Sequence, residues 1–279
     1  MMYKNILGTS TLEGNLIDSQ NKLHLPLQGL AGRNGFGAAD IHVHSTASDG
    51  MASVAEILEF VAERGDLDII AVTDHGEISG GYEARELAAK HNYPFEIIVG
   101  MELNTQEGHL LALFLEKPVA SNQHLSDTIA AIHAQGGLCI APHPMSPFSE
   151  SINHKDMQTI MHTGDPEIYF DGIETFNATI MGTISNHRAK KINETYKLAE
   201  TGGSDAHFLV SIGSGLTLFP GRTAEDFRRS ILERTTMPMK GHTPSYFEIG
   251  LMQILKQQGK SRSFFFRGII KNAARSLVK

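Results

Sequence analysis

The sequence has very little cysteine and no segment that resembles a targeting signal. Cys139 is the single cysteine among 279 residues, which excludes a disulfide within the chain, and the apolar residues around it are typical of a buried strand. A reducing compartment is the natural expectation for such a chain. The first residues lack a basic region followed by a long apolar run. We therefore expect no signal peptide, no membrane span and a cytoplasmic location.

Acidic residues are missing from the last part of the chain. After Glu248 there are seven basic residues and no acidic one, so this tail carries +7. Because the net charge is −7, the first 248 residues carry −14. A body with this charge is a poor match for a broad nucleic-acid-binding surface, although bound metals would offset part of it.

From residue 39 onward, strand-like and helix-like segments alternate. The predicted strands are 39–44, 67–73, 95–101, 108–115, 137–142, 169–176, 200–204 and 213–218. The predicted helices are 53–64, 81–91, 121–135, 153–163, 183–199 and 222–234. This alternation predicts an α/β fold with a mainly parallel sheet covered by helices. We divide the chain into an irregular N-terminal extension at 1–38, one domain at 39–243 and a tail at 244–279.

Potential metal ligands recur where the predicted strands end. His42 and His44 stand two residues apart on a strand, so their imidazoles point to the same face and can bind one cation together. Buried, hydrogen-bonded histidines are the alternative, which the further ligand-bearing segments disfavour. In a closed α/β barrel these strand ends converge on one face. His109 is the exception, since it lies at the start of its predicted strand. We expect that strand to run antiparallel, or to begin directly from a tight return after Glu102.

The order of these motifs resembles the polymerase-and-histidinol-phosphatase (PHP) superfamily over residues 39–220. The motifs are His42-x-His44 with Ser48-Asp49-Gly50, Thr73-Asp74-His75, Gly100-x-Glu102, His109-Leu110-Leu111, His143-Pro144 and Gly203-Ser204-Asp205-Ala206-His207. The resemblance implies a distorted seven-stranded (β/α) TIM-like barrel with a trinuclear metal site. It also implies a stand-alone form, because the chain has no room for a large insertion or a polymerase body.

Carried over residue by residue, the family pattern implies nine metal ligands. The first cation would be held by His42, His44, Glu102 and Asp205. Glu102 would bridge to a second cation, held also by His109 and His143. A third would be held by Asp49, His75 and His207. Glu102, Asp205 and His207 are expected to take catalytic roles. The site would hold about two or three divalent ions, and its His and carboxylate ligands suit Zn, Mn or Fe.

Other polar residues near the strand ends are candidates for substrate binding. Glu174 and Asn177 follow a predicted strand and are expected to support ligands or contact substrate, with strand-end packing as the alternative. Arg188, with Lys190, is a candidate cation for a phosphate, the alternative being a solvated helix charge. His187 is expected at the pocket rim. Asp74 is expected either to orient an imidazole or to lie at the surface.

The other histidines are expected on the surface or on helices. They are His24, His91, His124, His133, His154, His162 and His242.

The tail segment 262–278 is predicted to be a basic amphipathic helix. Its basic residues Arg267, Lys271, Arg275 and Lys279 recur every four positions beside an apolar stripe. Three kinds of docking are compatible with this pattern. The helix could dock on the barrel or on another subunit, on an anionic membrane surface, or on a nucleic-acid backbone.

We expect a metal-dependent phosphoesterase that acts on a small phosphorylated molecule, such as a nucleotide or sugar phosphate. It would cleave a phosphomonoester or phosphodiester with a hydroxide bridged by two metals. A 5'-3' exonuclease that trims short single-stranded nucleic acid is the first alternative. A non-catalytic barrel that binds metals or phosphates is the second, and it is disfavoured because every ligand motif is filled.

Overall fold

The computed structural model describes residues 35–147, 149–179 and 182–276, with side chains up to Phe264. Most of the N-terminal extension, and the side chains of the basic stripe that begins at Arg267, lie outside this description. Within it, one nine-stranded sheet dominates. Its strands are β1 (Phe36–Val43), β2 (Ile69–Val72), β3 (Glu96–Asn104), β4 (His109–Leu113), β5 (Leu138–Ala141), β6 (Gly172–Asn177), β7 (Ala199–Gly203), β8 (Gly215–Pro220) and β9 (Met237–Lys240).

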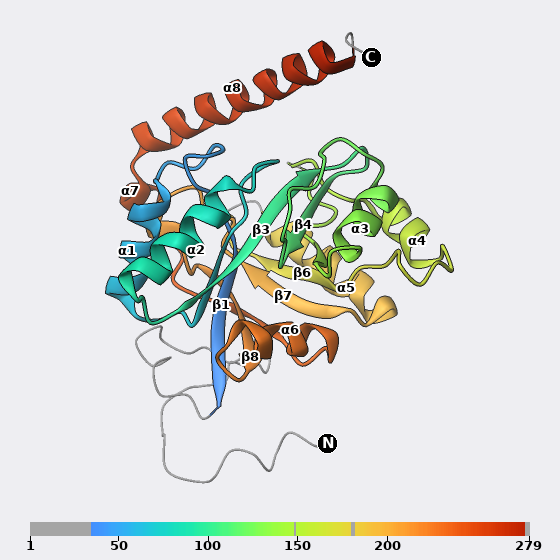
Figure 1. Ribbon diagram of the computed structural model, residues 1–279, viewed down its shortest axis with the longest axis horizontal. Coiled ribbons are helices and arrows are strands. Elements are labelled where there is room, and N and C mark those ends of the chain that lie inside the picture. Colours follow the sequence, from blue (N-terminus) through green and yellow to red (C-terminus); the bar gives the residue numbers. More distant parts are fainter. Residues whose placement is uncertain (1–34, 148, 180–181, 277–279) are drawn as a thin grey trace.

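The helices pack around the sheet (Figure 1). They are α1 (Val54–Arg64), α2 (Ser79–His91), α3 (Leu125–His133), α4 (His154–Met161), α5 (Gly182–Tyr196), α6 (Ala224–Leu232), α7 (Tyr246–Ile249) and α8 (Leu251–Ser276). A short 3₁₀ turn, η2 (Leu209–Ser211), follows β7. None of the described helices is both long enough and apolar enough to cross a membrane.

The sheet is almost closed into the expected seven-stranded barrel. Its order is β7-β6-β5-β4-β3-β2-β1-β8-β9. At one end the two sides of the ring meet, because Val43, the last residue of β1, forms a parallel bridge with Ala206 after β7. The His44 amide there donates a hydrogen bond to the Ala206 carbonyl at 2.9 Å. Strands β8 and β9 extend the sheet beyond β1.

The expectation of a mainly parallel sheet is wrong for β4 and for the β8–β9 extension. β4 runs antiparallel to both β3 and β5, and β8 runs antiparallel to both β1 and β9. The loop from Asn104 to His109 explains β4, since a parallel crossover needs a dozen or more residues and this connection is a tight return. The expected antiparallel course of the strand that begins at His109 is therefore confirmed.

Helix α1 illustrates how local sequence defines an element. Ser53 and Glu56 form a capping box, and Gly65 ends the helix in the left-handed region at φ 63°. The apolar side chains Val54, Leu58 and Val61 are buried against the sheet. One amphipathic stripe with defined ends is sufficient here to predict both the helix and its buried face.

Other boundaries differ from the predictions. Strand β1 begins at Phe36, because Phe36 to Ala39 pair with β8, a partner that is distant in sequence. The helix predicted at 183–199 ends at Tyr196, where Asn193 exchanges side-chain hydrogen bonds with the backbone of Leu198 and so ends the helix. Strand β9 and helix α7 were not predicted at all.

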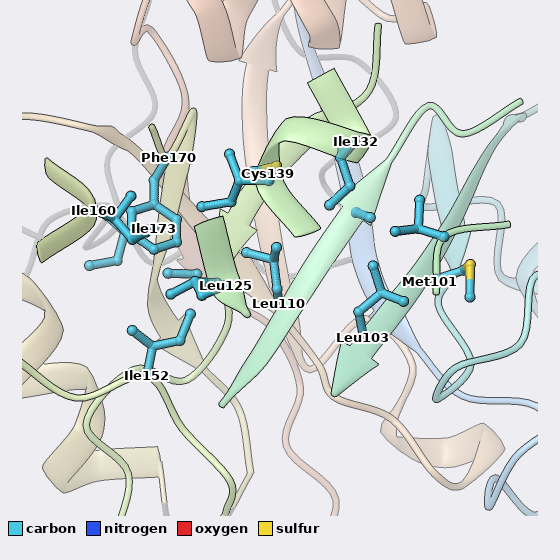
Figure 2. Close-up of a cluster of buried hydrophobic side chains, with 14 of the residues drawn as sticks. Met101, Leu103, Leu110, Leu125, Ile132, Cys139, Ile152, Ile160, Phe170 and Ile173 are labelled. Atoms are coloured by element: carbon cyan, nitrogen blue, oxygen red, sulfur yellow. The ribbon is translucent and has the colours of Figure 1, made fainter. Parts of the chain in front are cut away.

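A large apolar core supports the β3–β4 side of the barrel. Figure 2 shows Met101, Leu103 and Leu110 in one cluster with Cys139 and with side chains of the neighbouring helices. Cys139 is fully buried, as expected, and burial raises the pKa of its thiol well above the usual range. This packing fixes the ends of β3 and β4, which carry two of the predicted ligands.

Helix α8 is longer than the predicted tail helix and has a distinctive course. It spans 26 residues from Leu251 and is preceded by Gly250, whose φ of 87° turns the chain between α7 and α8. Figure 1 shows α8 as a long rod that crosses above one end of the barrel. Hydrogen bonds from α8 to Asp49 and Gly50 identify that end as the one where the predicted ligands lie.

Candidate metal centre

The fold brings all nine predicted ligands to one end of the barrel. The β1 residue His42 and its neighbour His44 are essentially unexposed, and Glu102 near the end of β3 is 1% exposed. The loops after β2, β5 and β7 supply His75, His143, Asp205 and His207, and the loop after β1 supplies Asp49. His109 reaches the same end because an antiparallel strand begins where its parallel neighbours finish.

Glu102 lies at the centre of the cluster, and its two carboxylate oxygens face different histidines. Oε2 lies 3.2 Å from His42 Nε2 and 3.3 Å from His44 Nε2. Oε1 lies 2.9 Å from His109 Nδ1 and 3.1 Å from His143 Nε2. Oε2 also lies 3.3 Å from Nδ1 of His75, a predicted ligand of the third cation. A carboxylate whose two oxygens face different histidines in this way would suit a bridge between cations.

Two further carboxylates, those of Asp205 and Asp49, lie at the edges of the cluster. Asp205 Oδ1 lies 3.3 Å from His44 Nε2, and Asp49 Oδ1 lies 3.2 Å from His207 Nε2. The ring of His44 stacks between those of His75 and His207, with centroid separations of 4.6 and 4.3 Å. His44 thus lies between the first and third predicted ligand groups. The division of the nine ligands among three cations stays a prediction.

The donor set fits divalent cations. Several overlapping groups of three or four His, Asp and Glu side chains place their ligand atoms within 4.8 Å of one another. Both ring nitrogens of His44 and of His109 are buried without a hydrogen bond of good geometry among the described residues, as is Asp49 Oδ1. Buried polar atoms that converge in this way incur a desolvation cost unless a ligand satisfies them. Imidazole and carboxylate donors without a thiolate suit Zn, Mn or Fe.

The electrostatics of the cluster favour positive charge. Burial alone would lower the pKa of His44, but the carboxylates of Asp205 and Glu102 raise it to about 10. Burial alone would likewise lower the pKa of His109, but the carboxylate of Glu102 raises it to about 9. His75 differs: burial, together with its charged neighbours His44 and His109, lowers its pKa to about 3. Protons and metal ions therefore compete for the same nitrogens.

Glu174 and Asn177 lie behind the ligands. Glu174 is fully buried; its Oε1 lies 3.2 Å from His42 Nδ1, and its Oε2 accepts a 2.7 Å hydrogen bond from the His143 amide. The Asn177 side-chain amide donates to Glu174 Oε2 and to Asp205 Oδ2, at 2.9 and 3.2 Å. These contacts position three ligands. They do not fit the predicted contact of Glu174 with substrate, because its carboxylate is shielded from the opening.

Asp74 has neither of its two predicted roles. It is fully buried, and its carboxylate accepts hydrogen bonds from the Ser45 amide, the Ser45 hydroxyl and the Ser48 hydroxyl, at 2.7, 2.7 and 2.5 Å. Asp74 therefore holds the loop that connects β1 to α1, and that loop carries Asp49. A serine-rich segment next to a ligand motif was the available sequence signal for this role.

The predicted substrate-binding residues on α5 lie at the edge of the site. Arg188 is exposed and donates a 3.2 Å hydrogen bond to the Met145 carbonyl, two residues after His143. His187 is exposed beside it. Arg188 is thus on the His143 side of the cluster, whereas the direct contacts of His187 with a substrate stay a prediction.

Sequence reasoning missed several residues near the cluster. Glu150 lies 3.6 Å from His109 Nε2, and the α8 side chains Gln257, Lys260 and Phe264 approach the Asp49 and His75 side. Glu150 follows a ligand motif by only a few residues, which was a weak signal. Nothing in the local sequence of α8 indicates that it returns to the metal ligands.

Comparisons with known proteins agree with this geometry. The model of the PHP domain family matches residues 40–202, and the model of a PHP-associated family matches residues 183–236. The first match covers more than half of the chain and includes seven of the nine predicted ligands. The other two, Asp205 and His207, lie within the second match.

Individual relatives cover smaller parts of the chain. An uncharacterised protein of Methanocaldococcus jannaschii is 32% identical over 162 residues, which are 54% of this chain and 88% of that protein. A 5'-3' exoribonuclease of Haemophilus influenzae is 40% identical over 82 residues, 28% of this chain and 29% of that enzyme. A two-domain protein of Bacteroides vulgatus with a predicted PHP-like metal-dependent phosphoesterase domain has the same fold, with a TM-score of 0.60 and 20% identity. The match covers 74% of this chain and 65% of that structure.

Proposed function

Because this chain belongs to the PHP domain family, we propose that it is a metal-dependent phosphoesterase acting on a small phosphorylated molecule. The ester would be a phosphomonoester or a phosphodiester, as in a nucleotide or a sugar phosphate. The observation that carries this proposal is the position of Glu102, whose two oxygens face different sets of histidines at 2.9 to 3.3 Å, three at Oε2 and two at Oε1. Multi-cation sites of this kind serve hydrolysis of phosphate esters.

The nine ligands would hold divalent cations of Zn, Mn or Fe. Such cations supply Lewis acidity toward phosphate oxygens and lower the pKa of water. The chain's own residues do the positioning. Glu174 orients His42 through Nδ1. The side-chain amide of Asn177 donates hydrogen bonds to both Glu174 and Asp205 and so fixes Asp205 relative to Glu174. Each of these hydrogen bonds restricts a ligand to one rotamer, so the site is organised before substrate arrives.

Access to the cluster determines where substrate would enter. Asp205 and His207 are 13% and 18% exposed, whereas the other seven ligands are 7% exposed or less. Asp205 and His207 therefore border the open side and are the ligands that a bound ester would meet first. Arg188, on the His143 side, would attract the phosphate, and its guanidinium suits phosphate oxygens.

The experiment is a substrate screen with metal analysis. The purified full-length chain is assayed with phosphomonoesters, cyclic phosphodiesters, nucleoside bisphosphates and short oligonucleotides, with Mn and with Zn. We expect more than one equivalent of divalent metal and turnover of a small ester. Protein that binds metal but cleaves none of these compounds would favour the non-catalytic alternative, and protein that binds no metal would refute the proposal.

A 5'-3' exonuclease is the second candidate. It is favoured by the similarity of an 82-residue segment to the exoribonuclease of Haemophilus influenzae and by the basic residues of α8. The same screen separates the two: release of mononucleotides from a 5'-labelled oligonucleotide, faster than hydrolysis of any small ester, would make the nuclease the better assignment.

A further inference from the structure

Helix α8 presents one of its faces to the metal cluster. Gln257, Lys260 and Phe264 are half-buried, whereas Leu255, Lys256 and Arg262 on the same helix are exposed. Residues spaced by three or four positions share one face of a helix, so these three form a row toward the barrel. The row lies within the part of α8 whose side chains the structure describes.

Each residue of the row meets the Asp49 and His75 side of the cluster. The Gln257 amide lies 3.4 Å from Asp49 Oδ2, and the Lys260 ammonium donates a 2.5 Å hydrogen bond to the Gly50 carbonyl. The ring of Phe264 lies 6.4 Å from that of His75, between centroids. The helix therefore forms a wall beside two of the metal ligands.

The point that Lys260 contacts is held firmly. A Cβ at Gly50 would lie 2.1 Å from the His44 carbonyl oxygen, so the loop is folded closely against His44. The next amide, that of Met51, donates a 2.8 Å hydrogen bond to the His207 carbonyl. Lys260 therefore binds a segment of backbone that itself contacts two ligands, His44 and His207.

The positive charge of Lys260 beside the cluster suits an anionic substrate. The ligand set contains the carboxylates of Asp49, Glu102 and Asp205, which neutralise part of the charge of any bound cations. A phosphate ester then needs further cationic donors. Arg188 lies on the His143 side and Lys260 on the Asp49 side, so the two cations flank the cluster. An ammonium group has three N–H donors, and the contact with Gly50 uses one of them.

We propose that Lys260 is a substrate-binding residue, supplied by the C-terminal helix to the oxygens of a phosphate held over the metal cluster. The inference rests on the proposed phosphoesterase function and deepens it, because it makes α8 part of the site. Lys260 acts on binding: its contact with the anionic group is made in the bound ester as well as during the reaction. Its loss therefore raises KM more than it lowers kcat.

The test compares two lysines of the same helix. Lys260→Gln removes the ammonium that faces the cluster, and Lys256→Gln removes an exposed one, one helical turn away. With the metal-loaded full chain, we expect Lys260→Gln to weaken binding of inorganic phosphate, measured by calorimetry, by about tenfold and to raise KM for the best ester similarly. Lys256→Gln should leave both unchanged, and Lys260→Arg should restore most of the binding.

Metal content distinguishes this role from a structural one. If Lys260 only tethers the loop at Gly50, Lys260→Gln lowers metal content or the melting temperature and leaves the phosphate affinity per loaded site unchanged, which overturns the proposal. Equal phosphate affinities of the wild type, Lys260→Gln and Lys256→Gln also overturn it. Failure of the proposed function is a different result, namely a wild type without turnover, and phosphate binding would then still test Lys260.

Discussion

Glu174 Oε1 lies 3.2 Å from Nδ1 of His42, and neither side chain has exposed surface. The carboxylate fixes the imidazole so that Nε2 points toward Glu102 and Asp205. This pairing of a buried carboxylate with a ligand histidine is characteristic of metal sites, in which it orients the ring and makes it a better ligand.

Replacing Glu174 with glutamine should weaken metal binding without unfolding the protein. The amide keeps the shape of the side chain but loses the negative charge that orients His42, so we expect metal affinity to fall by about 10- to 100-fold. Competition with a chelator measures this. Glu59→Gln, on the exposed face of α1, is the matched control. Identical affinities for the two variants would contradict the positioning role.

Asp205 combines a ligand role with an unusual backbone conformation. Its φ is 52°, in the left-handed region, which asparagine tolerates better than alanine. Asp205→Asn and Asp205→Ala should both remove hydrolytic activity, because both lose the carboxylate that faces His44. The alanine variant should in addition be less stable by about 1 kcal/mol. Denaturant titration of both metal-free variants tests this, and near-wild-type turnover in either would refute the ligand assignment.

Gly50 should tolerate no side chain, because a Cβ there would lie 2.1 Å from the His44 carbonyl oxygen. Gly50→Ala must displace backbone that carries ligands, so we expect a loss of about 1–3 kcal/mol of stability together with weaker metal binding. Gly259 in α8 is the control, since a Cβ there meets nothing within 4 Å. Gly259→Ala should be neutral or stabilising by about 0.5–1 kcal/mol. Equal unfolding free energies for the two variants would contradict the steric argument.

His133, at the end of α3, should contribute stability that depends on pH. Its Nδ1 lies 2.8 Å from the Glu167 carbonyl and its Nε2 lies 2.9 Å from Asp171 Oδ2, so both nitrogens face acceptors and the ring is best satisfied as an imidazolium. Burial alone would lower the pKa of His133, but these hydrogen bonds raise it above the usual value.

The sign of the effect follows from the raised pKa. The stabilising contribution is complete below the unfolded-state pKa of about 6.5 and is lost as pH rises through the higher folded-state pKa. Relative to His133→Gln, the wild type should be more stable by roughly 1 kcal/mol at pH 6, a value reduced by solvent screening, and by less at pH 9. A difference in unfolding free energy that is constant between these pH values would refute the imidazolium assignment.

Much of the site could be predicted because its signals are local. His42 and His44 share a face through the two-residue period of a strand, and ligands at the ends of successive strands meet at one end of a barrel. The position of His109 at the start of its strand made an antiparallel course one of two expectations for β4, and the structure has that course. The helix at α1 was predictable for the same reason, since its cap and apolar stripe lie within a few residues of each other.

The parts that could not be predicted depend on segments distant in sequence. The start of β1 at Phe36 is set by pairing with β8, and the role of Asp74 is set by the hydroxyls of the loop that begins at Ser45. Glu174 could be placed near the site, but whether it faced substrate or His42 depended on how β6 sits against β1 in the ring.

By itself, the sequence determined which side chains are available to bind metal and that they follow strand ends, because the identity of a ligand and the period of a strand are properties of short segments. Only the tertiary structure decided which oxygen of Glu102 faces which histidine, and that α8 returns to place Lys260 beside the Asp49 loop. Those relationships depend on the closure of the sheet and on the direction of a helix after Gly250, which no local pattern encodes.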